Sequence, residues 1–217
     1  MFKKPYIEIV SPKQFWADNL DEIIVPCIKN TPKEYKEIKP WHGLNVKQRI
    51  ERLFESQTQA MDKTIKQCDG IIKLWQKSFL LKFPCDTIID IKKDTGWRYS
   101  TSNSIFNIGG HSKQQYGKMM PDTWTVKFTY NLFLNNNIDI LPMSPIYHKK
   151  QPYEVLPGVI FQRHRSPSIL NIIAAFPNTT ESYLFKKGDP LCILYTGAPV
   201  VLRSKFDSTA ELIMPTF

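Results

Sequence analysis

The stretch that decides the fold class is an eleven-residue run that reads Trp124-Thr125-Val126-Lys127-Phe128-Thr129-Tyr130-Asn131-Leu132-Phe133-Leu134. Large apolar side chains recur at every second position from Trp124 to Leu134, and polar side chains occupy most of the positions between them. Because successive side chains of a β-strand point to opposite faces, this alternation gives one apolar and one polar face. The run therefore predicts a half-buried antiparallel strand.

The same period of two continues on both sides of this strand. Residues 79–83 and 87–92 alternate in the same way, and residues 168–176 are apolar on both faces, which predicts a central strand. Residues 183–185 and 191–195 flank Lys187-Gly188-Asp189-Pro190, which predicts a hairpin turn whose glycine takes a positive φ. Short strands with frequent turn signals predict a mainly β fold: an antiparallel sandwich, a jelly roll or a partly closed barrel.

The front of the chain has a different pattern. Five prolines punctuate residues 1–42, so we expect a Pro-rich extended arm with a short strand at Tyr6–Val10. Residues 43–77 show helical spacing, first from Asn45 to Met61 and again from Asp69, which predicts one or two N-terminal helices. The expected organisation is the arm, this helical segment and a β-sandwich over residues 78–217, all within one compact domain.

Composition and charge limit the classes of partner. The chain has 217 residues, 42% of them hydrophobic and 23% charged, which is typical of a globular protein and not of a disordered one. No apolar run is long enough to cross a membrane, so we expect a cytoplasmic protein without a membrane partner. The net charge is +9, from 29 basic and 20 acidic side chains.

Three basic pairs stand out, and they could bind phosphates or an acidic partner if the fold brought them together. They are Lys149-Lys150, Arg163 with Arg165, and Lys186-Lys187. Because the remaining excess charge is spread thinly along the chain, we expect only weak, sequence-independent association with nucleic acid. An ordinary solvated surface is the competing interpretation.

Cysteines and histidines give no metal motif. The cysteines are scattered, and no two have the spacing of a zinc ribbon or finger, so we expect reduced, buried thiols without structural zinc or disulfides. The four histidines are isolated from one another and from carboxylates in the sequence, with His111 and His148 as first suspects if distant ligands converge. We therefore predict no cofactor.

The chemically richest stretch is residues 96–103. It suggests a ligand-binding surface made by Trp97, Arg98, Tyr99 and Asn103, and His111 and His148 are further candidate ligand-binding residues. Alternation places Trp97 and Tyr99 on the face opposite Arg98, so that rings could stack a base or sugar and the guanidinium could bind its phosphate. The alternative is that Trp97 anchors a hairpin with a polar outer face. No nucleophile elbow or activated cysteine is present, so no catalytic residue is assigned.

Three segments resemble an uncharacterised family of tailed-bacteriophage proteins of the DUF6065 type. These segments are Lys77-Ser78-Phe79-Leu80-Leu81-Lys82-Phe83-Pro84-Cys85-Asp86, Gly96-Trp97 and Phe185-Lys186-Lys187-Gly188-Asp189-Pro190-Leu191-Cys192. The resemblance covers residues 65–195 and implies a viral source and a β-rich fold, but it supplies no catalytic residues.

The leading functional interpretation is a phage-encoded, non-catalytic binding protein. It would act on a viral or host protein, in virion assembly or in host manipulation, and would be found in the cytoplasm of the infected host or in the virion. The first alternative is a nucleotide-pocket or metal-dependent enzyme on a jelly-roll or dUTPase-like barrel. The second alternative is a weak nucleic-acid-binding protein, and a homo-oligomer is compatible with each interpretation.

Overall fold

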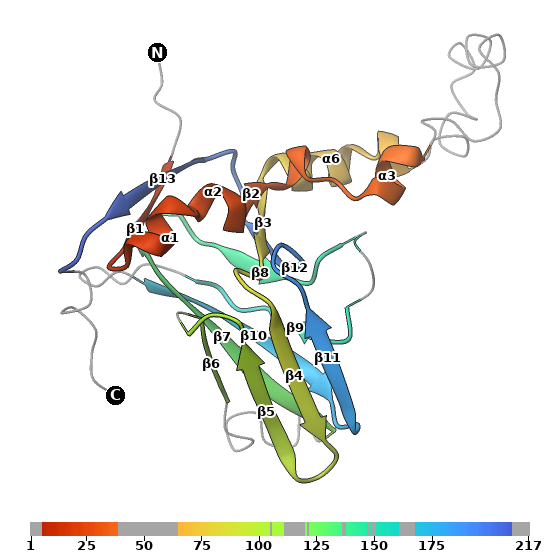
Figure 1. The fold of residues 1–217 in the computed structure, drawn as a ribbon. Helices are drawn as coiled ribbons and strands as arrows, with labels where there is room; N and C mark the ends of the chain where they lie inside the picture. The colour runs from red at the N-terminus through yellow and green to blue at the C-terminus, as the bar shows by residue number, and fades with distance from the viewer. Residues whose placement is uncertain are drawn as a thin grey trace, which may run out of the picture.

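The largest sheet is built around the strand that the opening run predicts. The computed structural model describes residues 6–38, 65–104, 106–110, 120, 122–135, 138–146, 148, 151–160 and 168–209. In it β7 (Thr123–Asn135) is antiparallel to β10 (Ser168–Pro177) over almost its whole length (Figure 1). The helix predicted from Asn45 to Met61 lies outside the described residues.

Four shorter strands complete this six-stranded sheet. The strand order is β13-β1-β7-β10-β9, and β6 pairs with β7 beside this path. The added strands are β1 (Tyr6–Ser11), β6 (Asn107–Gly110), β9 (Glu154–Val155) and β13 (Val201–Phe206). Only the β1–β13 pairing among them is parallel. The predicted strand at residues 6–10 is therefore confirmed, and so is the internal position of β10, which lies between β7 and β9.

Two smaller sheets pack against the largest one. The first has the order β11-β4-β5, from β4 (Thr87–Lys92), β5 (Gly96–Thr101) and β11 (Glu181–Phe185). The second has the order β2-β3-β12-β8, from β2 (Ile24–Pro26), β3 (Ser78–Lys82), β8 (Leu141–Met143) and β12 (Pro190–Tyr195). Within the described part of the chain no sheet closes into a barrel, and the predicted mainly β, sandwich-type fold is confirmed.

One apolar core joins the largest sheet to both smaller sheets. Val126, Phe128 and Tyr130 of β7 are fully buried, and they share this core with Leu81 of β3 and Ile89 of β4. The aromatic rings interlock there: the ring centroid of Phe83 lies 5.6 Å from that of Phe128, with the planes nearly perpendicular. Such edge-to-face pairs add to the stabilisation that burial gives.

The strand patterns also predict that Trp124, Phe128, Tyr130, Ile173 and Ile193 share one core. Trp124 packs against the main core but is only partly buried at the end of β7, and Ile173 lies on the opposite face of β10 from the buried Ile172. Ile193 is buried in a second apolar cluster. Alternation alone does not tell which face of a strand with two apolar faces meets the larger core.

The second cluster covers the outer face of the four-stranded sheet. Helix α6 (Asp69–Gln76), which confirms the helix predicted from Asp69, and α3 (Lys33–Glu37) supply Trp75 and Tyr35 to it, with ring centroids 4.2 Å apart. These rings pack with Leu80 and Ile193, while the next residues along the same strands face the main core. Strands β3 and β12 are therefore buried on both faces.

The arm is not simply extended, which corrects the expectation for residues 1–42. After β1 the described part of the arm forms three short helices and one 3₁₀ turn, namely α1 (Gln14–Asp18), α2 (Leu20–Ile23), η1 (Cys27–Lys29) and α3. Trp16, Leu20 and Ile23 from these turns are buried in the main core. Proline permits this because Pro32 lies at the N-cap of α3, where its missing N–H removes no helical hydrogen bond.

The turn at residues 186–189 does not close a hairpin, contrary to the prediction. Strand β11 pairs with β4 and strand β12 pairs with β3, so the turn carries the chain from the three-stranded sheet into the four-stranded one. The segment between β3 and β4 makes the same crossing beside it, held by Phe83 N donating to Asp189 O and Gly188 N donating to Phe83 O, both at 2.9 Å. Gly188 has a φ of 90°, as predicted for this glycine. Together the four strands form one long antiparallel ribbon with a bend.

No helix among the described residues has both the length and the apolar character needed to span a membrane.

Candidate functional site

Residues 96–103, which are rich in aromatic and polar side chains, form strand β5 and the start of the loop after it. Strand β5 is the last described strand at one edge of the three-stranded sheet. Strand β5 is antiparallel to β4, with Asp90 opposite Arg98 and Ile89 opposite Tyr99. Since Ile89 is fully buried, Tyr99 and Trp97 point toward the inner side of the sheet and Arg98 points outward. The predicted alternation of rings and guanidinium along this strand is therefore found.

An ion pair joins the outward side chains of this sheet. Arg98 Nε donates to Asp90 Oδ2 at 3.0 Å, and Ser182 Oγ from β11 donates to Asp90 Oδ1. The hydrogen bond from Ser182, followed by that from Arg98, lowers the pKa of Asp90 from its ordinary value. The Asp90 carboxyl thus connects all three strands on the outer face. Because its Arg98 partner is 73% exposed, the pair contributes little to stability.

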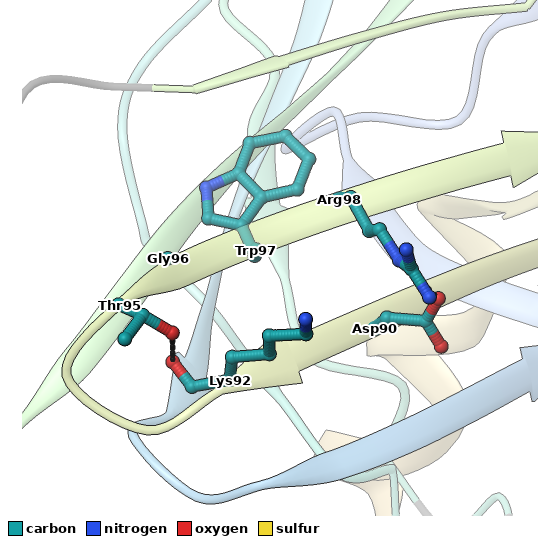
Figure 2. A pocket seen from close by; sticks show the side chains of 6 residues that line it. All are labelled: Asp90, Lys92, Thr95, Gly96, Trp97 and Arg98. Carbon is teal, nitrogen blue, oxygen red and sulfur yellow. Dashed lines mark hydrogen bonds and ion pairs between the residues drawn. The ribbon is translucent and has the colours of Figure 1, made fainter.

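A shallow hollow of about 360 Å³ lies at the β4–β5 hairpin (Figure 2). Its lining consists of Asp90, Lys92, Thr95, Gly96, Trp97 and Arg98. Figure 2 shows the Trp97 ring on one side of the strand and the Arg98–Asp90 pair on the other. These side chains do not converge on a common point as the residues of a nucleotide pocket would.

Trp97 has a packing partner in another sheet. Its ring lies against Gly110 of β6, where an added Cβ would be only 3.3 Å from the indole. Trp97 is partly buried against the main core, and its ring centroid is 6.2 Å from that of Tyr99. These contacts favour the interpretation in which Trp97 anchors the hairpin.

The tip of the hairpin is fastened by an amide that no sequence motif indicates. Asn178 Oδ1 accepts hydrogen bonds from Asp94 N and from Trp124 Nε1, both at 2.9 Å, and Asn178 Nδ2 donates to Asp94 Oδ1 at 2.7 Å. Asp94 has a φ of 58°, the left-handed region that aspartate tolerates better than most residues. Asn178 thus ties the β4–β5 turn to the start of β7.

The other predicted ligand-binding residues lie elsewhere. The carbonyl of Asn103 accepts a hydrogen bond from Thr101 Oγ1 at 3.0 Å, so this residue shapes the end of β5. Burial lowers the pKa of His148, and the charges of Glu34 of α3 and Lys82 of β3, on the side of the four-stranded sheet, also act on it. His111 lies outside the described residues. The structure therefore does not bring His148 together with Trp97 and Arg98.

The only described basic pair of the three is Lys186-Lys187, and both of its ammonium groups are paired. Lys186 Nζ lies 2.9 Å from Asp86 Oδ2, and Lys187 Nζ lies 3.3 Å from Glu22 Oε2. Lys149-Lys150, Arg163 and Arg165 lie outside the described residues. Two of the six cations proposed for a phosphate patch are thus neutralised by carboxylates of the same chain.

Asp86 fixes the bend of the long ribbon, a role that sequence reasoning missed. Its Oδ1 accepts a hydrogen bond from Lys187 N at 2.8 Å, in addition to the Lys186 contact at Oδ2. The Lys187 N–H, and then the Lys186 ammonium, lower the pKa of Asp86. Asp86 lies between the alternating segments 79–83 and 87–92. This position could have indicated a turn-stabilising role, because an aspartate between two strands commonly accepts hydrogen bonds from N–H groups of a turn.

A second hollow, of about 450 Å³, lies beside this bend. Acidic, basic and amide side chains line it. They come from α2, the C-cap of η1, β3 and the 186–189 turn, and they are Asp21, Glu22, Asn30, Lys82 and Lys187. Their charges largely balance, so the hollow shows no preference for an anion or a cation.

All four cysteines are free thiols, and Cys27, Cys85 and Cys192 are buried as expected, whereas Cys68 is exposed, which corrects the expectation of a buried thiol at that position. Burial raises the pKa of Cys27 to about 12 and places that of Cys192 well above its ordinary value. Among the described residues, no three His, Cys, Asp or Glu side chains lie together as a metal site would need.

Comparisons of the chain with protein families, with curated proteins and with solved structures gave no match.

Proposed function

We propose that this protein works by binding another protein, without catalysis, through the outer face of the sheet β11-β4-β5. The resemblance of its motifs to tailed-phage proteins favours a viral or host partner, in virion assembly or in manipulation of an infected cell. The cytoplasm of that cell, or the virion, would then be its location.

The observation that carries this proposal is the difference between the two smaller sheets. Helices α6 and α3 cover the outer face of the four-stranded sheet, where Leu80 and Ile193 are buried. No described element covers the corresponding face of β11-β4-β5 (Figure 1). A sheet in an antiparallel sandwich can face water, but then its outer residues are polar as a rule.

The uncovered face has an apolar centre and a polar rim. Leu184 of β11 is 55% exposed and lies directly opposite Ile88 of β4, which is half-buried. The Arg98–Asp90 pair and Lys92 lie beside them on the same face. This arrangement is typical of a protein–protein interface, in which apolar side chains occupy the middle and charges surround them.

The contacts of the polar residues support binding over catalysis. The Asp90 carboxyl is engaged by Arg98 and Ser182, and its lowered pKa makes it a poor general base or acid near neutral pH. Among the described residues, its hydrogen-bond partners belong to the framework of the sheet.

Site-specific photo-crosslinking in the cells that naturally make the protein tests this proposal. A photoreactive residue at position 184 should give one dominant protein adduct, and the same residue at Ile28, which is 45% exposed but lies on η1, should not. A photoreactive residue at Ser100, with Leu184 kept, should give an adduct with the same protein. Adding Leu184→Glu should abolish the adduct from position 100 without changing thermal stability. Equal labelling from positions 184 and 28 would contradict the assignment of this face.

A further inference from the structure

The outer edge of β5 presents a row of backbone groups with which no described strand pairs. Strand β5 ends the order β11-β4-β5, and among the described strands β4 alone pairs with it. In an antiparallel pair, residues alternate between those that exchange hydrogen bonds with the partner strand and those whose N–H and C=O point away from it. Which residues of β5 point away therefore follows from any one known bond.

One printed bond sets this alternation. Ser102 N donates to Asp86 O at 2.9 Å, which places residue 102 toward β4. Counting back in steps of two, Ser100 and Arg98 also exchange bonds with β4. Tyr99 and its neighbours Trp97 and Thr101 then direct their backbone N–H and C=O groups to the open edge, where no described residue pairs with them.

Side chains at this edge define what would fit there. Arg98 of β5 lies on the outer side, Lys92 lies on the same side of the neighbouring strand β4 opposite Gly96, and Lys93 lies in the adjoining turn. The two nearby carboxylates are already held, Asp90 by Arg98 and Asp94 by the Asn178 amide, whereas neither lysine forms an ion pair with a described residue. On the other side the 44% exposed ring of Tyr99 lies beside Trp97.

We propose that β5 receives an extended segment of the partner as a fourth strand, with acidic side chains on the outer side near Lys92 and apolar ones facing Tyr99. This rests on the proposed function, which it deepens by naming the partner's recognition element. Main-chain hydrogen bonds give such strand addition its affinity, and alternate side chains give it specificity. Positive side chains beside a sheet edge oppose pairing with a second copy of the same edge, so the complementary charge favours a different, acidic chain.

The direction of the backbone N–H groups provides a variant that separates backbone pairing at the β5 edge from packing against the Tyr99 ring. Tyr99→Pro removes an N–H that points to the open edge and leaves the bonds of Arg98 and Ser100 to β4 in place. Tyr99→Ala removes the ring but keeps that N–H. Strand addition predicts that the proline variant loses binding and that the alanine variant only weakens it.

The probe is a capped seven-residue peptide of alternating glutamate and valine, and its control has lysine in place of glutamate. With the glutamate peptide at saturation, amide exchange measured by NMR should slow about tenfold or more at Trp97, Tyr99 and Thr101, but not at Arg98 or Ser100. The lysine peptide should have no effect. Lys92→Glu, which leaves the backbone unchanged, should weaken binding severalfold and decides the matter if Tyr99→Pro does not fold.

Three results would overturn the proposal: equal protection by the lysine peptide, full binding by Tyr99→Pro, or protection that rises with protein concentration alone, which would indicate pairing between copies. Failure here is distinguishable from failure of the proposed function. An adduct from position 184 without peptide binding at β5 would leave the uncovered face as an interface and remove only strand addition.

Discussion

Replacing Asn178 with alanine should loosen the β4–β5 hairpin and lower the stability of the whole domain. The side chain makes three hydrogen bonds, two as acceptor at 2.9 Å and one as donor at 2.7 Å, to Asp94 and Trp124. Each hydrogen bond contributes about 0.5–1.5 kcal/mol net, and we take values near the lower end because Asp94 is exposed. Asn178→Ala should therefore lower the free energy of unfolding by about 2 kcal/mol.

In a chain of this size, that loss corresponds to a fall in Tm of about 4–8 °C. The assay is thermal and urea unfolding followed by circular dichroism and by tryptophan fluorescence. Loss of the Trp124 indole bond should also shift the emission of the folded state. A variant within about 0.5 kcal/mol of the wild type would refute the reasoning, since a change that small is typical of a surface position without specific contacts.

Asn178→Asp provides the matched control. It keeps an acceptor for Asp94 N and Trp124 Nε1, but it puts a second carboxylate where the amide donated to Asp94 at 2.7 Å. Repulsion between the two carboxylates raises their pKa values in the folded state. The folded variant then binds more protons than the unfolded chain, so its stability falls as the pH rises above about 4. Recovery of wild-type stability at lower pH is expected for the aspartate and not for the alanine variant.

Three further outcomes are expected. Phe128→Ala removes a fully buried ring from the main core and should cost about 3–5 kcal/mol in urea unfolding; unchanged stability would mean that β7 is wrongly placed. Asp86 has a lowered pKa in the folded state, so its contribution is present above the ordinary carboxyl pKa and lost as the pH falls through the folded value. The stability difference between wild type and Asp86→Asn should accordingly shrink on acidification, and a constant difference across that titration would argue against the turn contacts. Cys68 is the exposed thiol, so one cysteine per chain should react rapidly with a thiol reagent, and Cys68→Ser should abolish this fast phase; rapid reaction of two or more would contradict the burial of the others.

Local patterns predicted the strands and their faces, because a strand's side-chain period depends only on the backbone. The alternation from Trp124 to Leu134 correctly predicted the buried face of β7, and the helical spacing from Asp69 correctly predicted α6. The positive φ of Gly188 was also predictable, since it follows from the lack of a Cβ.

Pairing between strands was not predictable in the same way. Lys187-Gly188-Asp189-Pro190 has the composition of a hairpin turn, yet it joins two sheets, because the strands on its two sides pair with β4 and β3, which are distant in the sequence, and not with each other. The arm residues Trp16 and Leu20 form short helices for a related reason: burial in a core made by distant segments outweighs the extended preference near prolines.

The sequence by itself determined that this is a mainly β protein, which positions of β5 and β7 share a face, and that no familiar catalytic motif is present. Only the tertiary structure decided that, among the described residues, helices cover one small sheet and not β11-β4-β5, that Lys186 and Lys187 are neutralised, and that β5 is the last described strand of its sheet. The physical reason is that periodicity is a property of neighbours along the chain. Exposure, charge pairing and edge position depend on contacts between residues such as Asp86 and Lys186, which are 100 positions apart.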